Sequence, residues 1–135
     1  MKKILFLLLV VLVLVGCQSK PITGETISTI DGAYQNVTPT ELKSMLGIKD
    51  FVLVNVHIPF AGNIPGTDLS IPYNEIEQNL GQLPTDKTAK IVLYCSSGRM
   101  SEIAANELVS MGYTNVWNLK GGMVDWQQAG FELKK

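Results

Sequence analysis

The sequence has little positive charge that could gather in one place. It contains a single arginine, Arg99, and a single histidine, His57, and its lysines are scattered along the chain. Proteins that bind nucleic acid normally cluster Lys and Arg on one surface. Here 11 basic residues are balanced by 12 acidic ones, for a net charge of −1. We therefore expect no nucleic-acid partner.

Cysteine is also scarce, and Cys17 and Cys95 are the only two. No Cys-x-x-Cys pair is present, which argues against a disulfide reductase. Two cysteines in an exported protein usually suggest a disulfide. The fate of Cys17 therefore decides whether Cys95 is a single thiol.

A long membrane-spanning run is missing. Residues 4–15 are apolar and follow Lys2 and Lys3, but they fall short of the roughly 20 residues that cross a bilayer. A basic start, an apolar stretch and a small residue are typical of a secretory signal. Its end, "LVGC", resembles a bacterial lipobox. The resemblance implies a signal peptide over residues 1–16 and a lipid on Cys17; an ordinary secretory signal with a free or disulfide-bonded Cys17 is the alternative.

This reading places the folded part outside the cytoplasm, as a membrane-anchored lipoprotein of a bacterial cell envelope or periplasm. Residues 17–33 are small and polar, with no sustained helical or strand period, and predict a tether. A partly ordered N-terminal arm is the alternative for the second half of that segment. Residues 34–135 are then expected to form one domain with an adequate core.

The domain alternates short apolar runs with helical patterns. Strands are predicted at residues 34–37, 51–56, 69–71, 90–94 and 115–119, and helices at 39–46, 73–83, 103–111 and 122–130. Thr38, Pro39 and Glu41 form a helix-start signature. Strict alternation predicts an α/β domain with a largely parallel sheet. Sites in such sheets lie at the carboxyl ends of the strands, where Cys95 and His57 are both expected.

The stretch "YCSSGRMS" concentrates reactive and polar groups. Cys95 starts a loop between a buried strand and a helix, where backbone N–H groups and the helix dipole favour an anion. Gly98 permits tight curvature and Arg99 adds a fixed charge. Hydroxyl donors come from Ser96, Ser97 and Ser101. A thiol in this place suits nucleophilic chemistry; a buried structural cysteine beside a solvated arginine is the alternative.

Three ordered motifs resemble the single-domain rhodaneses, a sulfurtransferase family. "YCSSGRMS" is similar to the active-site loop of that family, and "VLVNVHIPFAGNIPGT" resembles its first signature, with an Ile-Pro-Gly turn at residues 64–66. "GYTNVWNLKGGMVDWQQAG" resembles the C-terminal signature, with Gly121, Gly122 and Trp126 in the expected order. The resemblance implies an α/β domain with a five-stranded parallel sheet flanked by helices.

The resemblance also implies a function. Cys95 would be the catalytic nucleophile and would carry a sulfane sulfur as a persulfide. The loop that binds it comprises Ser96, Ser97, Gly98, Arg99, Met100 and Ser101. The sulfur would come from thiosulfate or from a persulfide or polysulfide. It would pass to cyanide or to a thiol, either of a small molecule or of a protein sulfur acceptor. No metal or organic cofactor would be required.

The chain departs from the family's pattern beside this loop. Asn55, Val56 and His57 stand where the family often has Asp, Val and Arg, and Met100 stands where a basic residue or threonine is frequent. Fewer positive charges weaken the attraction for thiosulfate, a dianion. We therefore expect poor use of thiosulfate. His57 is either a titratable substitute for the missing arginine or a residue that bonds the loop backbone.

Two other functions use the same features. A phosphatase of the same fold needs a loop one residue longer, with an arginine six positions after the cysteine, where this chain has Ser101. A non-catalytic, membrane-tethered persulfide carrier or docking module would also need Cys95. Turnover with small donors separates the carrier from the enzyme.

Overall fold

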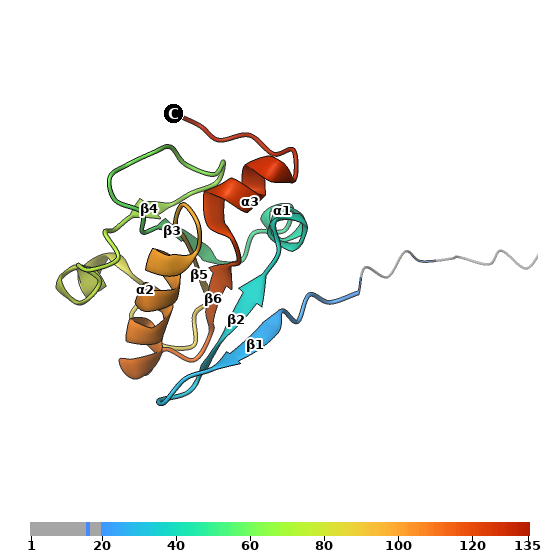
Figure 1. Ribbon diagram of the computed structural model, residues 1–135. Helices are drawn as coiled ribbons and strands as arrows, with labels where there is room; N and C mark the ends of the chain where they lie inside the picture. The colour runs from blue at the N-terminus through green and yellow to red at the C-terminus, as the bar shows by residue number, and fades with distance from the viewer. Residues whose placement is uncertain (1–15, 17–19) are drawn as a thin grey trace, which may run out of the picture.

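The computed structural model describes Gly16 and residues 20–135, so that Cys17 and most of the predicted signal peptide lie outside the described residues. The elements in chain order are β1 (Glu25–Ser28), β2 (Ala33–Val37), α1 (Pro39–Leu46), β3 (Val52–Asn55), β4 (Leu69–Ser70), the 3-10 helix η1 (Glu77–Gln82), β5 (Ile91–Tyr94), α2 (Arg99–Ser110), β6 (Val116–Leu119) and α3 (Gly122–Gln128). The six strands form one sheet in the order β1-β2-β6-β5-β3-β4 (Figure 1). Over the described residues, none of the helices has the length and apolar character needed to cross a membrane.

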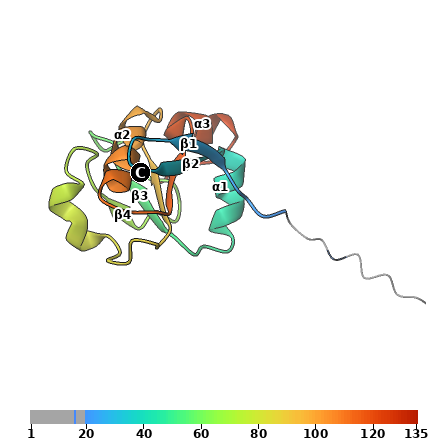
Figure 2. The same ribbon diagram turned by 90° about the horizontal axis from the view of Figure 1, so that it is seen from below.

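Strand β5 shows how the core is divided between two faces of the sheet. Ile91 and Leu93 pack on one face, in a cluster that includes Ala104, Ala105 and Leu108 of α2. Val92 and Tyr94 point to the other face, where they join buried side chains of α1 and α3. Figure 2 shows α2 and α1 on opposite sides of the strands. Burial on both faces explains why the central strands are almost continuously apolar.

The predicted α/β class, with a mostly parallel sheet flanked by helices, is confirmed. Strands β2, β6, β5, β3 and β4 pair in parallel. The sheet has a sixth strand that the sequence reading did not include: β1 pairs antiparallel with β2, from Glu25 opposite Asn36 to Ser28 opposite Ala33. Ile27 of β1 packs against the core on the α2 side. The second half of the predicted tether is thus an ordered arm, which was the alternative.

Local signals at the helix ends had mixed outcomes. The capping box of α1 is confirmed, because the Glu41 N–H donates to Thr38 Oγ1 at 3.3 Å and the Thr38 N–H donates to Glu41 Oε2 at 2.8 Å.

The predicted helix over residues 73–83 is wrong: only η1 forms there, and Asn79 inside it has non-helical φ and ψ of −112° and 15°. The Asn79 side chain instead donates to the carbonyl of Glu75 at 2.7 Å, a local bond that competes with the helix.

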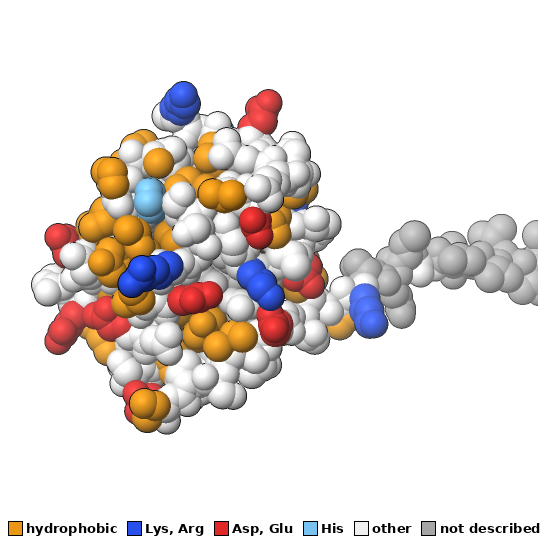
Figure 3. Space-filling model, viewed as in Figure 1, with side chains coloured by type: hydrophobic (Ala, Val, Ile, Leu, Met, Phe, Trp, Pro, Cys, Tyr) orange, Lys and Arg blue, Asp and Glu red, His pale blue; other side chains and the backbone are white. Residues whose placement is uncertain are grey.

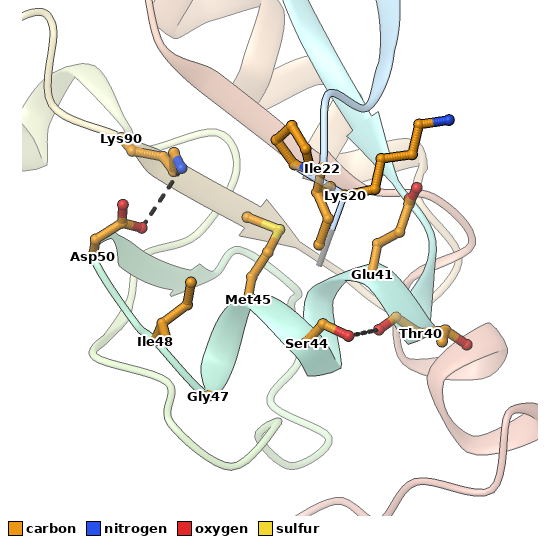
Figure 4. A pocket seen from close by; sticks show the side chains of 11 residues that line it. Lys20, Ile22, Thr40, Glu41, Ser44, Met45, Gly47, Ile48, Asp50 and Lys90 are labelled. Atoms are coloured by element: carbon orange, nitrogen blue, oxygen red, sulfur yellow. Dashed lines mark hydrogen bonds and ion pairs between the residues drawn. The ribbon is translucent and has the colours of Figure 1, made fainter. Parts of the chain in front are cut away.

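A hollow of about 740 Å³ lies between the N-terminal segment, α1 and the starts of β3 and β5 (Figure 4). Ile22, Met45 and Ile48 contribute its apolar lining, and an ion pair of 3.5 Å joins Lys90 to Asp50 beside it. Asp50 lies just before β3 and Lys90 just before β5, so the hollow is at the amino ends of these two strands. Cys95 follows the opposite, carboxyl end of β5 and does not line this hollow.

Candidate active site

The Cys95 sulfur lies beneath the loop that joins β5 to α2. Only 1% of the residue is exposed. The Gly98 N–H donates to Cys95 Sγ at 3.0 Å, and Ser101 Oγ lies 3.4 Å from the same sulfur. Ser101 Oγ is also 3.0 Å from the Gly98 carbonyl, and its one hydrogen can serve only one of these two acceptors at a time. The sulfur therefore has a fixed backbone donor and a second donor that can turn toward it.

Gly98 shapes this loop. Its φ of 105° is in the left-handed region that favours glycine, and it is the N-cap of α2. The Gly98 carbonyl accepts the Glu102 N–H at 3.0 Å, which begins the helix. The sulfur consequently faces the amino end of a 12-residue helix, where the helix dipole favours negative charge.

Helix α3 holds the same loop from the opposite side. The Met123 N–H donates to the Cys95 carbonyl at 2.8 Å, and the Val124 N–H donates to the Ser96 carbonyl at 2.9 Å. Gly122 has a φ of 58°, and a Cβ built on it would lie 2.4 Å from the Cys95 oxygen. Only glycine allows α3 to approach so closely. Both carbonyls are thereby turned toward α3 and engaged in hydrogen bonds.

The remaining loop residues differ in exposure. Ser97 and Arg99 are exposed, whereas Ser96 and Met100 are half-buried and Ser101 is fully buried. Within residues 20–135, Arg99 has no ion-pair partner. Its charge is therefore available to an approaching anion.

Asn55 and His57 lie at the neighbouring strand end. Asn55 pairs with Tyr94 in the sheet, and the Val56 N–H donates to the Tyr94 carbonyl at 2.9 Å, one residue before Cys95. Asn55 is only 2% exposed, and its Oδ1 accepts the backbone N–H of His57 at 3.0 Å. The Nδ1 atom of His57 is buried without a hydrogen-bond partner. In the neutral ring the hydrogen is best placed on Nε2, because an unpaired buried lone pair costs less than an unpaired N–H.

A model of the rhodanese-like domain family matches residues 38–129. The chain belongs to the rhodanese-like domain family. A sulfurtransferase of Allochromatium vinosum is 33% identical over 88 residues, which cover 63% of this chain and 79% of that protein. The mouse thiosulfate sulfurtransferase/rhodanese-like domain-containing protein 3 is 31% identical over 107 residues, 68% of each chain. The crystal structure of a rhodanese-like domain protein from Staphylococcus aureus is 30% identical, covers 74% of this chain and 98% of its own, and superposes with a TM-score of 0.61.

These relatives support a sulfur-transfer role for this rhodanese-like domain. The geometry around Ser101 bears on the phosphatase alternative. Ser101 is the sixth residue after Cys95, where that chemistry needs an arginine, and it is buried inside the first turn of α2. Arg99 lies two residues earlier and is exposed. The loop therefore lacks the arginine that would hold the oxygens of a phosphate.

Apolar side chains are exposed on the segments that border the site of this rhodanese-like domain. They are Phe60, from the loop after β3, Ile103 of α2 and Val124 of α3, which are 60%, 44% and 43% exposed. Figure 3 shows hydrophobic side chains gathered around the single histidine on this face. Exposed apolar surface of this kind often marks a contact site.

Proposed function

We propose that this protein is a sulfurtransferase that carries sulfane sulfur as a persulfide on Cys95. The observation that carries the proposal is the pair of donors on Sγ: the Gly98 N–H at 3.0 Å and the Ser101 hydroxyl at 3.4 Å, at the amino end of α2. Such an arrangement stabilises a sulfur anion before and after it takes up a second sulfur.

The proposed reaction has two covalent steps. The Cys95 thiolate attacks the outer sulfur of the donor, a new S–S bond forms, and the old bond breaks with its electron pair leaving on sulfite when the donor is thiosulfate. An acceptor thiolate or cyanide then attacks the outer sulfur of the persulfide. Cys95 leaves as a thiolate, so the protein returns to its starting state and no external oxidant is needed.

We further propose that a persulfide or polysulfide is a better donor than thiosulfate. In the segment 95–101 the only cation is Arg99, and the adjacent strand end presents Asn55 and His57 in place of an acid and an arginine. The cost of desolvating an ion grows with the square of its charge, whereas its attraction to a single cation grows only in proportion to its charge. One cation therefore offsets a smaller share of the cost of binding the thiosulfate dianion than of binding a singly charged persulfide.

The test is the mass of the full chain after treatment with thiosulfate or with polysulfide. We expect one added sulfur atom, mapped by peptide mass to Cys95, and its removal as thiocyanate when cyanide is added. Cys95→Ser is the negative control. Sulfur found elsewhere, or release of phosphate from an aryl phosphate that depends on Cys95 without a persulfide, would contradict the proposal.

A second candidate is a persulfide carrier that docks on one protein partner, and the exposed Phe60, Ile103 and Val124 favour it. A carrier takes up one sulfur per Cys95 and turns over slowly with small acceptors. A membrane anchor through a lipid on Cys17 is part of either proposal and would confine the reaction to the cell envelope.

A further inference from the structure

The segment 57–64, which we name the rim loop, connects the end of β3 to the turn before β4. Asn55 holds it at three points. Its Nδ2 donates to the Gly62 carbonyl at 2.9 Å and to Asn63 Oδ1 at 3.0 Å, and its Oδ1 accepts the His57 N–H. One buried amide therefore fixes both ends of the rim loop.

A second anchor comes from Tyr94, the residue immediately before Cys95. The Tyr94 hydroxyl accepts the Ile64 N–H at 3.0 Å and lies 2.7 Å from Thr67 Oγ1 and 3.2 Å from Asn63 Oδ1. Thr67 uses its hydrogen on the Ile64 carbonyl at 2.6 Å. The Tyr94 hydrogen is thus left for Thr67 Oγ1, with Asn63 Oδ1 as a longer second acceptor. Every group in this chain of bonds is satisfied without an ionised side chain.

We propose that Asn55 is a positioning residue, and that with Asn63 and Tyr94 it clamps the rim loop, and with it His57, to the root of the Cys95 loop. This inference concerns the site of the proposed sulfurtransferase, although the clamp itself is independent of the reaction. The clamp ties β5 to two segments that are about 30 positions earlier in the sequence, the rim loop and the strand β3 that leads into it. The bond from the His57 N–H to Asn55 Oδ1 holds the backbone of His57 at the end of β3, the strand that pairs with β5 just before Cys95.

The chemistry of the clamp explains why an amide stands at position 55. A carboxylate has no hydrogen to give, so an aspartate there would set a buried anion against two acceptors, the Gly62 carbonyl and Asn63 Oδ1, at about 3 Å. Asn63 therefore matches Asn55 and excludes an ionised acid. The rim loop is consequently held by bonds that do not change between pH 5 and 9.

The single histidine provides a direct probe of the clamp. The full chain labelled with ¹⁵N-histidine gives one backbone amide signal in a ¹H–¹⁵N correlation spectrum, that of His57. Exchange of this amide with solvent reports the bond to Asn55 Oδ1. We expect Asn55→Ala to speed the exchange about five- to tenfold, the change for one lost hydrogen bond.

Tyr94→Phe is the decisive variant, because it removes a hydroxyl whose hydrogen bonds to Ile64, Thr67 and Asn63 do not involve His57. Under the proposal the His57 amide signal shifts and the amide exchanges with solvent about two- to fivefold faster. The effect is smaller than that of Asn55→Ala because the bond from the His57 N–H to Asn55 Oδ1 is weakened and not removed. Tyr113→Phe is the matched control: Tyr113 is also buried, and its hydroxyl donates to the Pro84 carbonyl at 3.0 Å on another part of the fold. A His57 signal that responds equally to both variants, or to neither, overturns the clamp.

Asn55→Asp keeps the proposal testable if Asn55→Ala does not fold. A neutral carboxyl can still donate one hydrogen to the Gly62 carbonyl, whereas the carboxylate cannot. The His57 amide signal of this variant should resemble wild type at low pH and depart from it as the pH rises. A departure that is independent of pH would contradict the inferred hydrogen-bond directions.

The functional measurement is separate. With polysulfide as donor, Tyr94→Phe should raise KM about three- to tenfold and leave kcat near wild type, because a displaced rim loop weakens donor binding while the Cys95 loop keeps its own bonds. Unchanged KM with altered His57 exchange would overturn the positioning role and leave the sulfurtransferase proposal standing. A wild-type chain that loads no sulfur would refute the sulfurtransferase proposal, while the exchange data still decide the clamp.

Discussion

Replacing Gly122 by alanine tests whether α3 sets the geometry of the Cys95 loop. The added Cβ would lie 2.4 Å from the Cys95 oxygen and 2.6 Å from the Ser96 oxygen. These are the two carbonyls that accept the N–H groups of Met123 and Val124. The atoms nearest to the added Cβ all belong to the backbone of the loop, so the substitution acts first on that backbone.

Three effects set the expected magnitude. A φ of 58° costs a residue with a Cβ about 1–2 kcal/mol. The Cβ must also move away from the Cys95 oxygen by about 0.6 Å to reach a distance of 3.0 Å, the shortest that real structures tolerate. That movement weakens two hydrogen bonds worth about 0.5–1.5 kcal/mol each. We expect Gly122→Ala to lower the free energy of unfolding by about 2–5 kcal/mol, and to slow sulfur loading about ten- to a hundredfold because the sulfur is misplaced.

Gly112→Ala is the matched control. Gly112 also has a positive φ, 92°, but a Cβ on it would meet no atom within 4 Å. This variant should pay the conformational cost of about 1–2 kcal/mol and load sulfur at the wild-type rate. Urea unfolding gives the stabilities, and intact mass against time gives the loading rates. Equal stabilities and equal loading rates in the two variants would refute the claim that α3 holds the loop.

The other predictions concern single side chains. Arg99→Ala should slow sulfur loading from thiosulfate about ten- to a hundredfold, because a charge-assisted hydrogen bond is lost at the transition state. The effect with polysulfide should be smaller. Equal loading rates from thiosulfate for wild type and variant would contradict this role of Arg99. His57→Arg should raise thiosulfate turnover at pH 8 by adding a fixed cation, and unchanged turnover in a folded variant would assign His57 to structure. Burial raises the pKa of Tyr94 above 10.0, so the domain should lose stability as the pH rises above about 10, and Tyr94→Phe should make that loss less steep in urea titrations at pH 9 to 11. The flattening is partial because burial also raises the pKa of Tyr34; identical slopes would show that Tyr94 ionises freely. Cys17→Ala should prevent incorporation of an alkynyl fatty acid, and equal labelling of the variant would rule out the lipobox interpretation.

Local patterns were enough to predict the framework of the fold. The five parallel strands and the capping box at Thr38 were all found where the sequence placed them. The reason is that each rests on contacts within a few residues or on burial of both faces of the sheet. The position of Cys95 after a buried strand follows from the same pattern, since the polar loop begins where the apolar run stops.

Strand β1 was missed because its four residues, "ETIS", carry only one apolar side chain. β1 is stabilised by pairing with β2, in which the paired residues are up to 11 positions apart in sequence, and by the packing of Ile27 against the core. One signal was available: Asp31 and Gly32 form a dipeptide that is common in hairpin turns. The Thr29 N–H donates to the Gly32 carbonyl at 2.8 Å in that turn.

The contacts of Asn63, Tyr94 and Gly122 were beyond a reading of the sequence for a different reason. Tyr94 and Asn63 are 31 positions apart, and no local period relates them. Gly122 was noticed only as part of a motif, and its proximity to the Cys95 oxygen depends on how α3 returns across the sheet. Pairwise contacts between loops are set by the assembled fold, so no local pattern in the sequence determines which amide donates to which carbonyl.

The site separates two tasks that many active sites combine. Hydrogen bonds between uncharged groups hold both loops of the site. The Cys95 loop is held by the N–H groups of α3 that donate to the carbonyls of Cys95 and Ser96, and the rim loop is held by Asn55. Attraction of an anion falls to Arg99, which is exposed and has no ion-pair partner within residues 20–135. Salt screens an exposed charge but has little effect on buried neutral bonds. The geometry around the sulfur should therefore be independent of ionic strength, whereas the rate of encounter with an anionic donor should fall as salt is added. Because the ordering bonds are neutral and internal, the site stays ordered with a single cation even when no donor is bound.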